Sequence, residues 1–172
     1  MARIAGIIAK KFQVPNDEAM LIEYAAVLHD IGKQYVPKEI LMKPSKLTEE
    51  EYKIVQSHVL TGNEYILRMI KSLFAAYITT LQHHERLDGK GYAQVTNIHS
   101  YAKIVAVADV TDALLTKNRS YKQAWTPEEV IAYMQSNANK QFEAEYVAAL
   151  IESMDEIIAL YHNPDEKTIL TT

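Results

Sequence analysis

The sequence predicts an all-α protein folded as a single compact helical bundle. Apolar residues recur with helical spacing along nearly the whole chain, and no segment shows the strict alternation of a half-buried strand. Only five glycines and five prolines interrupt the 172 residues. A chain of this length fits one domain. We place that domain at residues 1–162 and expect the polar segment 163–172 to be a flexible tail.

The first half is expected to hold several short helices. A stripe from Ile4 to Phe12 predicts the first helix, which ends before Pro15. Asn16 or Asp17 could cap the second helix, and Gly32 could end it. The expected buried stripe of this second helix is Leu21, Tyr24, Ala25 and Leu28. Residues 37–42 suggest a short helical turn.

The second half is expected to hold longer helices. Thr48 and Glu51 form a predicted capping box, which opens a helix that continues through residue 59. Further helices are predicted at residues 73–85, at the very apolar segment 98–116, and at 143–161. Thr126 begins a second capping box, with Pro127 at the first helical position. The apolar helix 98–116 is expected to be central.

Composition limits the classes of function. The chain has no cysteine, so any metal must be held by His, Asp and Glu. A formal charge of −4 gives no basic surface for duplex DNA or RNA. No apolar run is long enough to span a membrane, and the N-terminus lacks a signal-peptide core. We expect a cytoplasmic protein, although the lack of cysteine bears on this only weakly.

Histidines gather in unusual places. His29-Asp30 closes an apolar helix, His58 follows on the next long helix, and His83-His84 precedes a glycine-bearing loop. Taken alone, the first pair fits a solvated helix end, and His58 fits a partly buried structural histidine. Two neighbouring histidines gain little from packing, so His83-His84 fits metal ligation as well as a structural role. His99 and His162 are expected to be structural or exposed.

Two carboxylates lie in the most apolar helix. Asp109 and Asp112 are three residues apart and share a helical face. A buried carboxylate costs several kcal/mol unless it meets a cation or hydrogen-bond donors. They could therefore be metal ligands or could simply hydrogen-bond a neighbouring helix.

Together these residues form the ligand set of a two-metal site, with one carboxylate able to bridge. The expected ligands are His29, Asp30, His58, His83, His84 and Asp109. Mixed nitrogen and oxygen ligands without sulfur suit manganese, iron, nickel or zinc. Two such ions can activate water at neutral pH and hold a phosphoryl oxygen.

Several segments resemble one family. Residues 29–33 read HDIGK, which matches the HDxGK signature of the HD phosphohydrolases. Residues 83–92, HHERLDGKGY, closely resemble the HHExxDGxGYP signature of the HD-GYP subfamily. The connecting segment 37–51 and the segment 106–114, AVADVTDAL, also resemble that subfamily. The resemblance covers residues 20–150 approximately.

The resemblance implies an HD-type bundle that hydrolyses cyclic di-GMP at a centre of two or three iron or manganese ions. It implies that the six expected ligands bind metal, with Asp30 bridging. Lys33 would stabilise charge on the scissile phosphate, and we group Asp112 with it as a catalytic candidate. Arg119 and Lys122 would contact phosphate, and Tyr92 would shape the nucleotide pocket. Without the resemblance, Lys33, Arg119 and Lys122 would be ordinary surface charges.

The chain also departs from the family pattern. A Glu and a His of the family would fall before Met1, and without them a third ion is not expected. Ala93 replaces the proline of the GYP motif, so the loop loses a fixed φ and some rigidity. The segment 94–97 is shorter than its family counterpart, and 114–119 is one residue longer. These changes border the expected substrate pocket.

Three functions therefore compete. The chain could cleave a cyclic dinucleotide, hydrolyse another small phosphate ester, or bind nucleotide as a weakened sensor or interaction module. A GGDEF-type or sensor-domain partner is expected for the family, and a homodimer is possible. Measuring both turnover and metal content would distinguish these alternatives, because bound metal without turnover would indicate a sensor.

Overall fold

The computed structural model describes residues 1–69, 74–116 and 124–162, and within these ranges it is all-α. The first elements are α1 (Ala2–Lys11), α2 (Asn16–Leu28), the 3₁₀ helix η1 (Ile31–Tyr35), α3 (Lys38–Leu41) and α4 (Glu49–Gln56). They are followed by α5 (His58–Met69), α6 (Phe74–Gln82), α7 (Ser100–Leu115), α8 (Pro127–Asn137), α9 (Ala144–Glu152) and α10 (Met154–His162). An isolated bridge between Ala138 and Phe142 is the only β-type pairing within the described ranges. The predicted fold class is confirmed, whereas the expected tail 163–172 lies outside these ranges.

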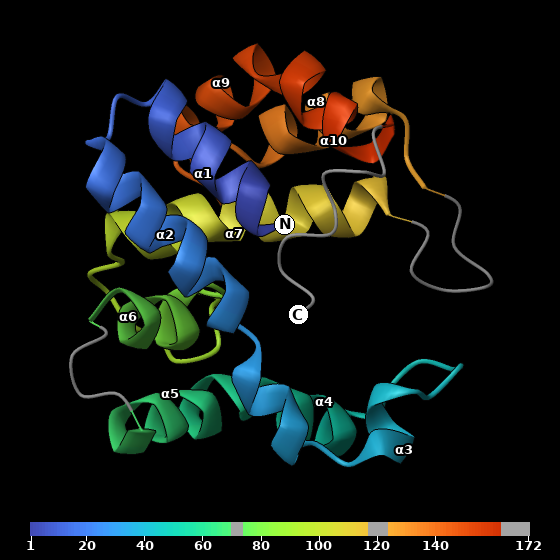
Figure 1. Ribbon diagram of the computed structural model, residues 1–172. Coiled ribbons are helices and arrows are strands. Elements are labelled where there is room, and N and C mark those ends of the chain that lie inside the picture. The colour runs from blue at the N-terminus through green and yellow to red at the C-terminus, as the bar shows by residue number, and fades with distance from the viewer. Residues whose placement is uncertain (70–73, 117–123, 163–172) are drawn as a thin grey trace.

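Helix α7 is the centre of the bundle. In Figure 1 it runs through the middle of the molecule, with α1, α8, α9 and α10 on one side. On the other side lie α6, then α5 and α4. The main core joins α7 to α1, α8 and α9 through fully buried side chains such as Ile8, Ile104, Met134 and Leu150. The apolar helix predicted at 98–116 is therefore central, as expected.

Both predicted capping boxes are present. The Thr48 hydroxyl accepts from the Glu51 amide, and the Glu51 carboxylate accepts from the Thr48 amide. Thr126 and Glu129 make the same pair of bonds at the start of α8. Two predicted long helices are each broken once: the first at Ser57, between α4 and α5, and the last at Ser153, between α9 and α10.

The predicted buried stripe of α2 is wrong at two positions. Leu21 and Tyr24 are exposed, and the buried residues are Ala19, Ile22, Ala25 and Ala26. This helix packs closely against α1 and α6, so its inner face carries mostly small residues. The predicted side-chain caps are also absent: Pro15 is the N-cap, and no side chain caps this end.

Gly32 does not end α2, which is where we had placed the stop. The helix ends at Leu28, and Gly32 lies inside η1. A Cβ at Gly32 would lie 1.9 Å from the carbonyl oxygen of His58, so only glycine allows η1 to contact α5 backbone to backbone. Gly62 of α5 lies on the same contact.

Within the described ranges, no helix has the length and apolar character required to cross a membrane.

Candidate metal centre

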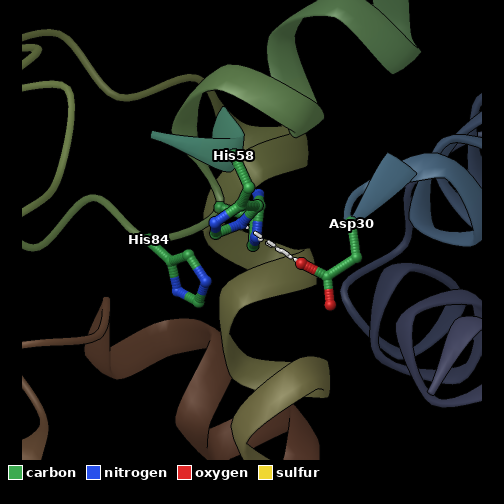
Figure 2. Close-up of side chains that lie close together, drawn as sticks. Asp30, His58 and His84 are labelled. Carbon is green, nitrogen blue, oxygen red and sulfur yellow. Dashed lines mark ion pairs between the residues drawn. The ribbon is translucent and has the colours of Figure 1, made fainter. Parts of the chain in front are cut away.

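The site forms where the end of α2, the start of α5 and the end of α6 meet. Asp30 lies between α2 and η1, and the close approach at Gly32 brings it to His58. His83 and His84 directly follow α6, which packs on both α2 and α5. Figure 2 shows Asp30 approaching His58 from one side, while His84 lies on the other. The tertiary contact at Gly32 thus helps to bring Asp30 close to His58, which lies 28 positions further along the chain.

Three of the histidine rings are oriented by their own helices. His29, His58 and His83 place Nδ1 at 2.7, 2.6 and 3.0 Å from the carbonyl oxygens of Ala26, Val55 and Thr79, respectively. A carbonyl can only accept, so each Nδ1 carries the hydrogen and donates. When such a ring is neutral, its lone pair is therefore on Nε2, the nitrogen that faces the cluster. Metal-binding histidines are typically held in this way.

The inward-facing atoms converge on Asp30. Its Oδ1 lies 3.2 Å from Nε2 of His58 and 3.7 Å from Nε2 of His83. Its Oδ2 lies 3.2 Å from Nε2 of His29. The two carboxylate oxygens therefore face different histidines, which is the arrangement of a bridging ligand.

Two groups of candidate ligands share this carboxylate. Ligand atoms of Asp30, His58, His83 and His84 all lie within 4.8 Å of one another. On the other side, Nε2 of His29 lies 3.5 Å from Oδ1 of Asp109. The structure thus brings all six expected ligands into one cluster.

Several buried atoms in this cluster lack hydrogen-bond partners. They are Nε2 of His29, His58 and His83, together with Oδ1 of Asp30. Orphaned buried polar atoms cost free energy, and their usual explanation in a native fold is an ion, water or functional role. Imidazole and carboxylate donors fit a divalent transition metal. The residues present therefore fit the metal expected from the sequence.

The charges in the cluster are strongly perturbed. Burial alone would raise the pKa of Asp30, but the neighbouring His29, His58 and His83 outweigh it and hold that pKa far below its usual range. Burial would lower the pKa of His29, but Asp109 and Asp30 raise it to about 9. Burial lowers the pKa of His83, and it lowers that of His84 to about 3 with help from His83. Both of these rings are therefore neutral at pH 7, as metal ligands must be.

Lys33 lies directly beside the cluster. Its ammonium donates to Oδ2 of Asp30 at 2.5 Å, one helical turn along η1. The side chain is 39% exposed, so it can also reach a molecule that approaches from solvent.

The remaining expected residues separate into three groups. Asp112 lies at the contact between α7 and α10, where its Oδ1 accepts from the Tyr161 hydroxyl, and it is not in the cluster. Tyr92 lies beside the cluster, and the centroid of its ring is 4.4 Å from the centroid of the His84 ring. Arg119 and Lys122 lie outside the described residues. His99 is structural, as expected, because it caps the N-terminus of α7.

Sequence reasoning missed the role of Glu85. This buried carboxylate accepts from the amides of Ala93 and Val95, both at 2.7 Å. A proline at position 93 has no N–H and could not donate this bond. The hydrogen bond from the Ala93 amide therefore compensates for the loss of loop rigidity that we expected from the missing proline. Gly91 is needed beside it, since a Cβ there would lie 2.4 Å from Oε1 of Glu85. A glutamate directly before a glycine-rich loop was the available signal.

Comparison with known proteins identifies the family of this chain. A model of the HD domain matches residues 1–146, which is most of the chain. The chain belongs to the HD domain family. This membership, together with the relatives below, confirms the resemblance to HD-GYP-type phosphohydrolases.

Several curated relatives match this HD domain. The cyclic di-GMP phosphodiesterase response regulator RpfG of Xanthomonas campestris is 37% identical over 91% of this chain and 42% of its own length. The 3'3'-cGAMP-specific phosphodiesterase 2 of Vibrio cholerae is 39% identical over 89% of this chain and 30% of its own. A cyclic di-GMP phosphodiesterase of Thermotoga maritima is 36% identical over 96% of this chain and 46% of its own length. The chain spans less than half the length of these relatives.

Proposed function

We propose that this chain is a metal-dependent phosphodiesterase that hydrolyses a cyclic dinucleotide, with cyclic di-GMP as the first candidate. The observation that carries the proposal is the two-sided environment of Asp30, whose oxygens face separate groups of buried, unpartnered ligand atoms. The substrate class is supported by relatives named for cyclic di-GMP and for 3'3'-cGAMP.

We assign two divalent ions of the iron or manganese type, with nickel or zinc as alternatives. One would be held by His58, His83 and His84 with Oδ1 of Asp30. The other would be held by His29 and Asp109 with Oδ2 of Asp30. Ions at these positions would supply Lewis-acid chemistry, lowering the pKa of water and polarising a phosphoryl oxygen.

Other groups of the protein orient the candidate ligands, stabilise charge on the substrate and shape the substrate site. The backbone carbonyls that hold each Nδ1 fix the ring orientations before substrate arrives, so little reorganisation is needed. Lys33 would give up Oδ2 of Asp30 to a metal ion held there, because an ammonium and a metal compete for the same oxygen. Its ammonium would then be free to face the scissile phosphate and to stabilise charge that develops on the phosphate oxygens. Tyr92 forms one wall of the substrate site beside His84.

Other expectations stay predictions. We keep as proposals that Arg119 and Lys122 contact phosphate and that the chain is cytoplasmic. We also keep as proposals a GGDEF-type or sensor-domain partner and a homodimer. The chain spans less than half the length of these relatives, so an activity like that of the complete relatives is likewise a proposal.

The experiment is a turnover assay on the 172-residue chain, reconstituted anaerobically with Mn²⁺ or Fe²⁺. Cyclic di-GMP, 3'3'-cGAMP and a panel of other phosphate esters are incubated with it, and products are separated by chromatography. We expect a linear dinucleotide or mononucleotide from a cyclic dinucleotide. Hydrolysis of another ester alone would redirect the proposal to a different HD hydrolase. Nucleotide binding without any turnover would indicate a sensor module.

A further inference from the structure

A cavity of about 440 Å³ opens directly beside the candidate metal centre. His83 and His84 form its boundary with the centre, and three tyrosines, Tyr52, Tyr92 and Tyr133, line its walls. This volume is within the range of small-molecule sites. The cavity therefore combines an aromatic lining with access to the ligand histidines.

The tyrosines come from three separate parts of the fold. Tyr52 lies on α4, Tyr92 on the loop after α6, and Tyr133 on α8. The hydroxyls of Tyr52 and Tyr92 are 3.1 Å apart, and the two rings meet edge to face with centroids 6.0 Å apart. Tyr52 nevertheless remains 46% exposed, so much of its ring is available to a ligand. An exposed aromatic side chain over a cavity is suited to stacking on a planar ring.

Donors and acceptors both line the cavity, but the acceptor oxygens of Glu85 and Gln141 already accept from the amides of Ala93 and Val95 and from the Tyr133 hydroxyl. Arg86 and Lys90 line it, and Arg86 is held in place by two hydrogen bonds to the carboxylate of Asp88. Cationic donors of this kind match the N7 and O6 acceptors of guanine, whereas adenine presents a donor at N6. The chemistry of the cavity thus favours a guanine base over an adenine base.

We propose that this cavity is a base-binding subsite, in which the guanine base of the substrate stacks on Tyr52 and meets the donors Arg86 and Lys90. The inference deepens the proposed function and rests on it, because the phosphate of the same nucleotide would lie at the metal centre. Tyr52 is then a determinant of affinity and of base selectivity. Its neighbour Tyr92 would separate the base from the ligand His84.

The test measures binding without turnover. GMP, AMP and ribose 5-phosphate are titrated into the Mn²⁺-loaded chain by calorimetry. The fluorescence of Trp125, the only tryptophan in the chain, gives a second readout because its ring packs edge to face on Tyr133. The variants are Tyr52→Ala and Tyr52→Phe, and Tyr24→Ala is the control, since Tyr24 is 59% exposed on α2.

We expect GMP to bind more tightly than AMP, and both more tightly than ribose 5-phosphate. Tyr52→Ala should weaken GMP binding about tenfold, the usual loss when a base loses its stacking partner. Tyr52→Phe and Tyr24→Ala should stay within about twofold of the parent, and ribose 5-phosphate should bind all four proteins alike. Equal affinity for GMP and ribose 5-phosphate, or an unchanged GMP affinity in Tyr52→Ala, would overturn the subsite.

The two proposals can fail separately. Base-dependent GMP binding in a chain that cleaves no cyclic dinucleotide would support the subsite and refute the proposed function. Cleavage of cyclic di-GMP with base-independent binding would do the reverse.

Discussion

Oδ1 of Asp30 lies 3.2 Å from Nε2 of His58, although the two residues are 28 positions apart and belong to different elements. Neither atom has a hydrogen-bond partner, and both are buried. The fold holds this pair together through the contact of η1 with α5 at Gly32. The geometry of the candidate centre therefore depends on a residue that is not itself a ligand.

Gly32→Ala should disrupt this contact. The new Cβ would lie 1.9 Å from the carbonyl oxygen of His58 and 2.6 Å from the Gly62 amide nitrogen. Backbone must move, so we expect a loss of about 3 kcal/mol in the free energy of unfolding and weaker metal binding. Urea unfolding measures the first effect. Gly89→Ala is the matched control, because it meets no atom within 4 Å and strains only a positive φ, at about 1 kcal/mol. Equal losses in the two variants would contradict the account.

Metal affinity should rise with pH. In the metal-free chain, Asp109 and Asp30 raise the pKa of His29 to about 9, well above its ordinary value of about 6.5. Metal must displace that proton, so affinity should climb up to about tenfold per pH unit from pH 6.5 to about 9 and then level off. Burial lowers the pKa of His83 and His84, so they add no competing proton in this range. Titration with Mn²⁺ at several pH values gives the slope.

The same shift affects the stability of the metal-free fold. A raised pKa of His29 contributes stability that is complete below about pH 6.5 and is lost as the pH rises through about 9. In His29→Asn both the slope of metal affinity and this loss should flatten. An affinity that does not change between pH 7 and 9 in the parent chain would rule out this protonation state.

Glu85→Ala should loosen the loop that carries Tyr92. The variant loses two short bonds to the amides of Ala93 and Val95 and leaves both donors unpartnered. Hydrogen bonds to a charged group contribute about 1.5–3 kcal/mol each, so we expect the free energy of unfolding to fall by about 3 kcal/mol. Chemical denaturation checks this, with the exposed Glu156→Ala on α10 as the control. A loss below about 0.5 kcal/mol would show that the loop does not depend on Glu85.

Lys33→Met should reduce catalysis without removing metal. Lys33 contacts Asp30 but offers no lone pair to a metal while protonated. We expect kcat for cyclic di-GMP to fall about 100-fold, the scale of losing one charge-stabilising donor, with metal content unchanged. Lys33→Arg should retain part of the rate. If Lys33→Met turned over at the parent rate, Lys33 would be only a partner of Asp30 in the metal-free state.

The sequence was sufficient for the fold class, and it also indicated the six side chains that the structure brings into one cluster. Helical spacing identified α1 and α7, and both capping boxes formed where Thr48 and Thr126 predicted them. The six expected ligands lie in one cluster. Each could be picked out from the sequence because it combines an unusual residue type with a helix end or an apolar helical face.

Other features depend on packing that a periodicity pattern does not contain. The inner face of α2 was misjudged because small side chains, not Leu21 and Tyr24, allow close contact with α1 and α6. Gly32 was read as a helix end, but its function is a tertiary contact with residue 58. Asp112 shares a face with Asp109, yet it pairs with Tyr161 on the distant α10. The cavity beside the candidate metal centre is lined by residues of α4, α8 and the loop after α6, which no local motif could indicate.

The most direct test of the central claim is the metal content of the Mn²⁺-reconstituted chain, measured by elemental analysis after gel filtration. We predict two ions per chain for the parent and for the exposed Asp155→Asn control. For Asp30→Asn we predict less than one ion and at least a 100-fold loss of phosphodiesterase activity, because both groups of ligands share this carboxylate. Two ions retained by Asp30→Asn, or none bound by the parent chain, would contradict a metal centre bridged by Asp30.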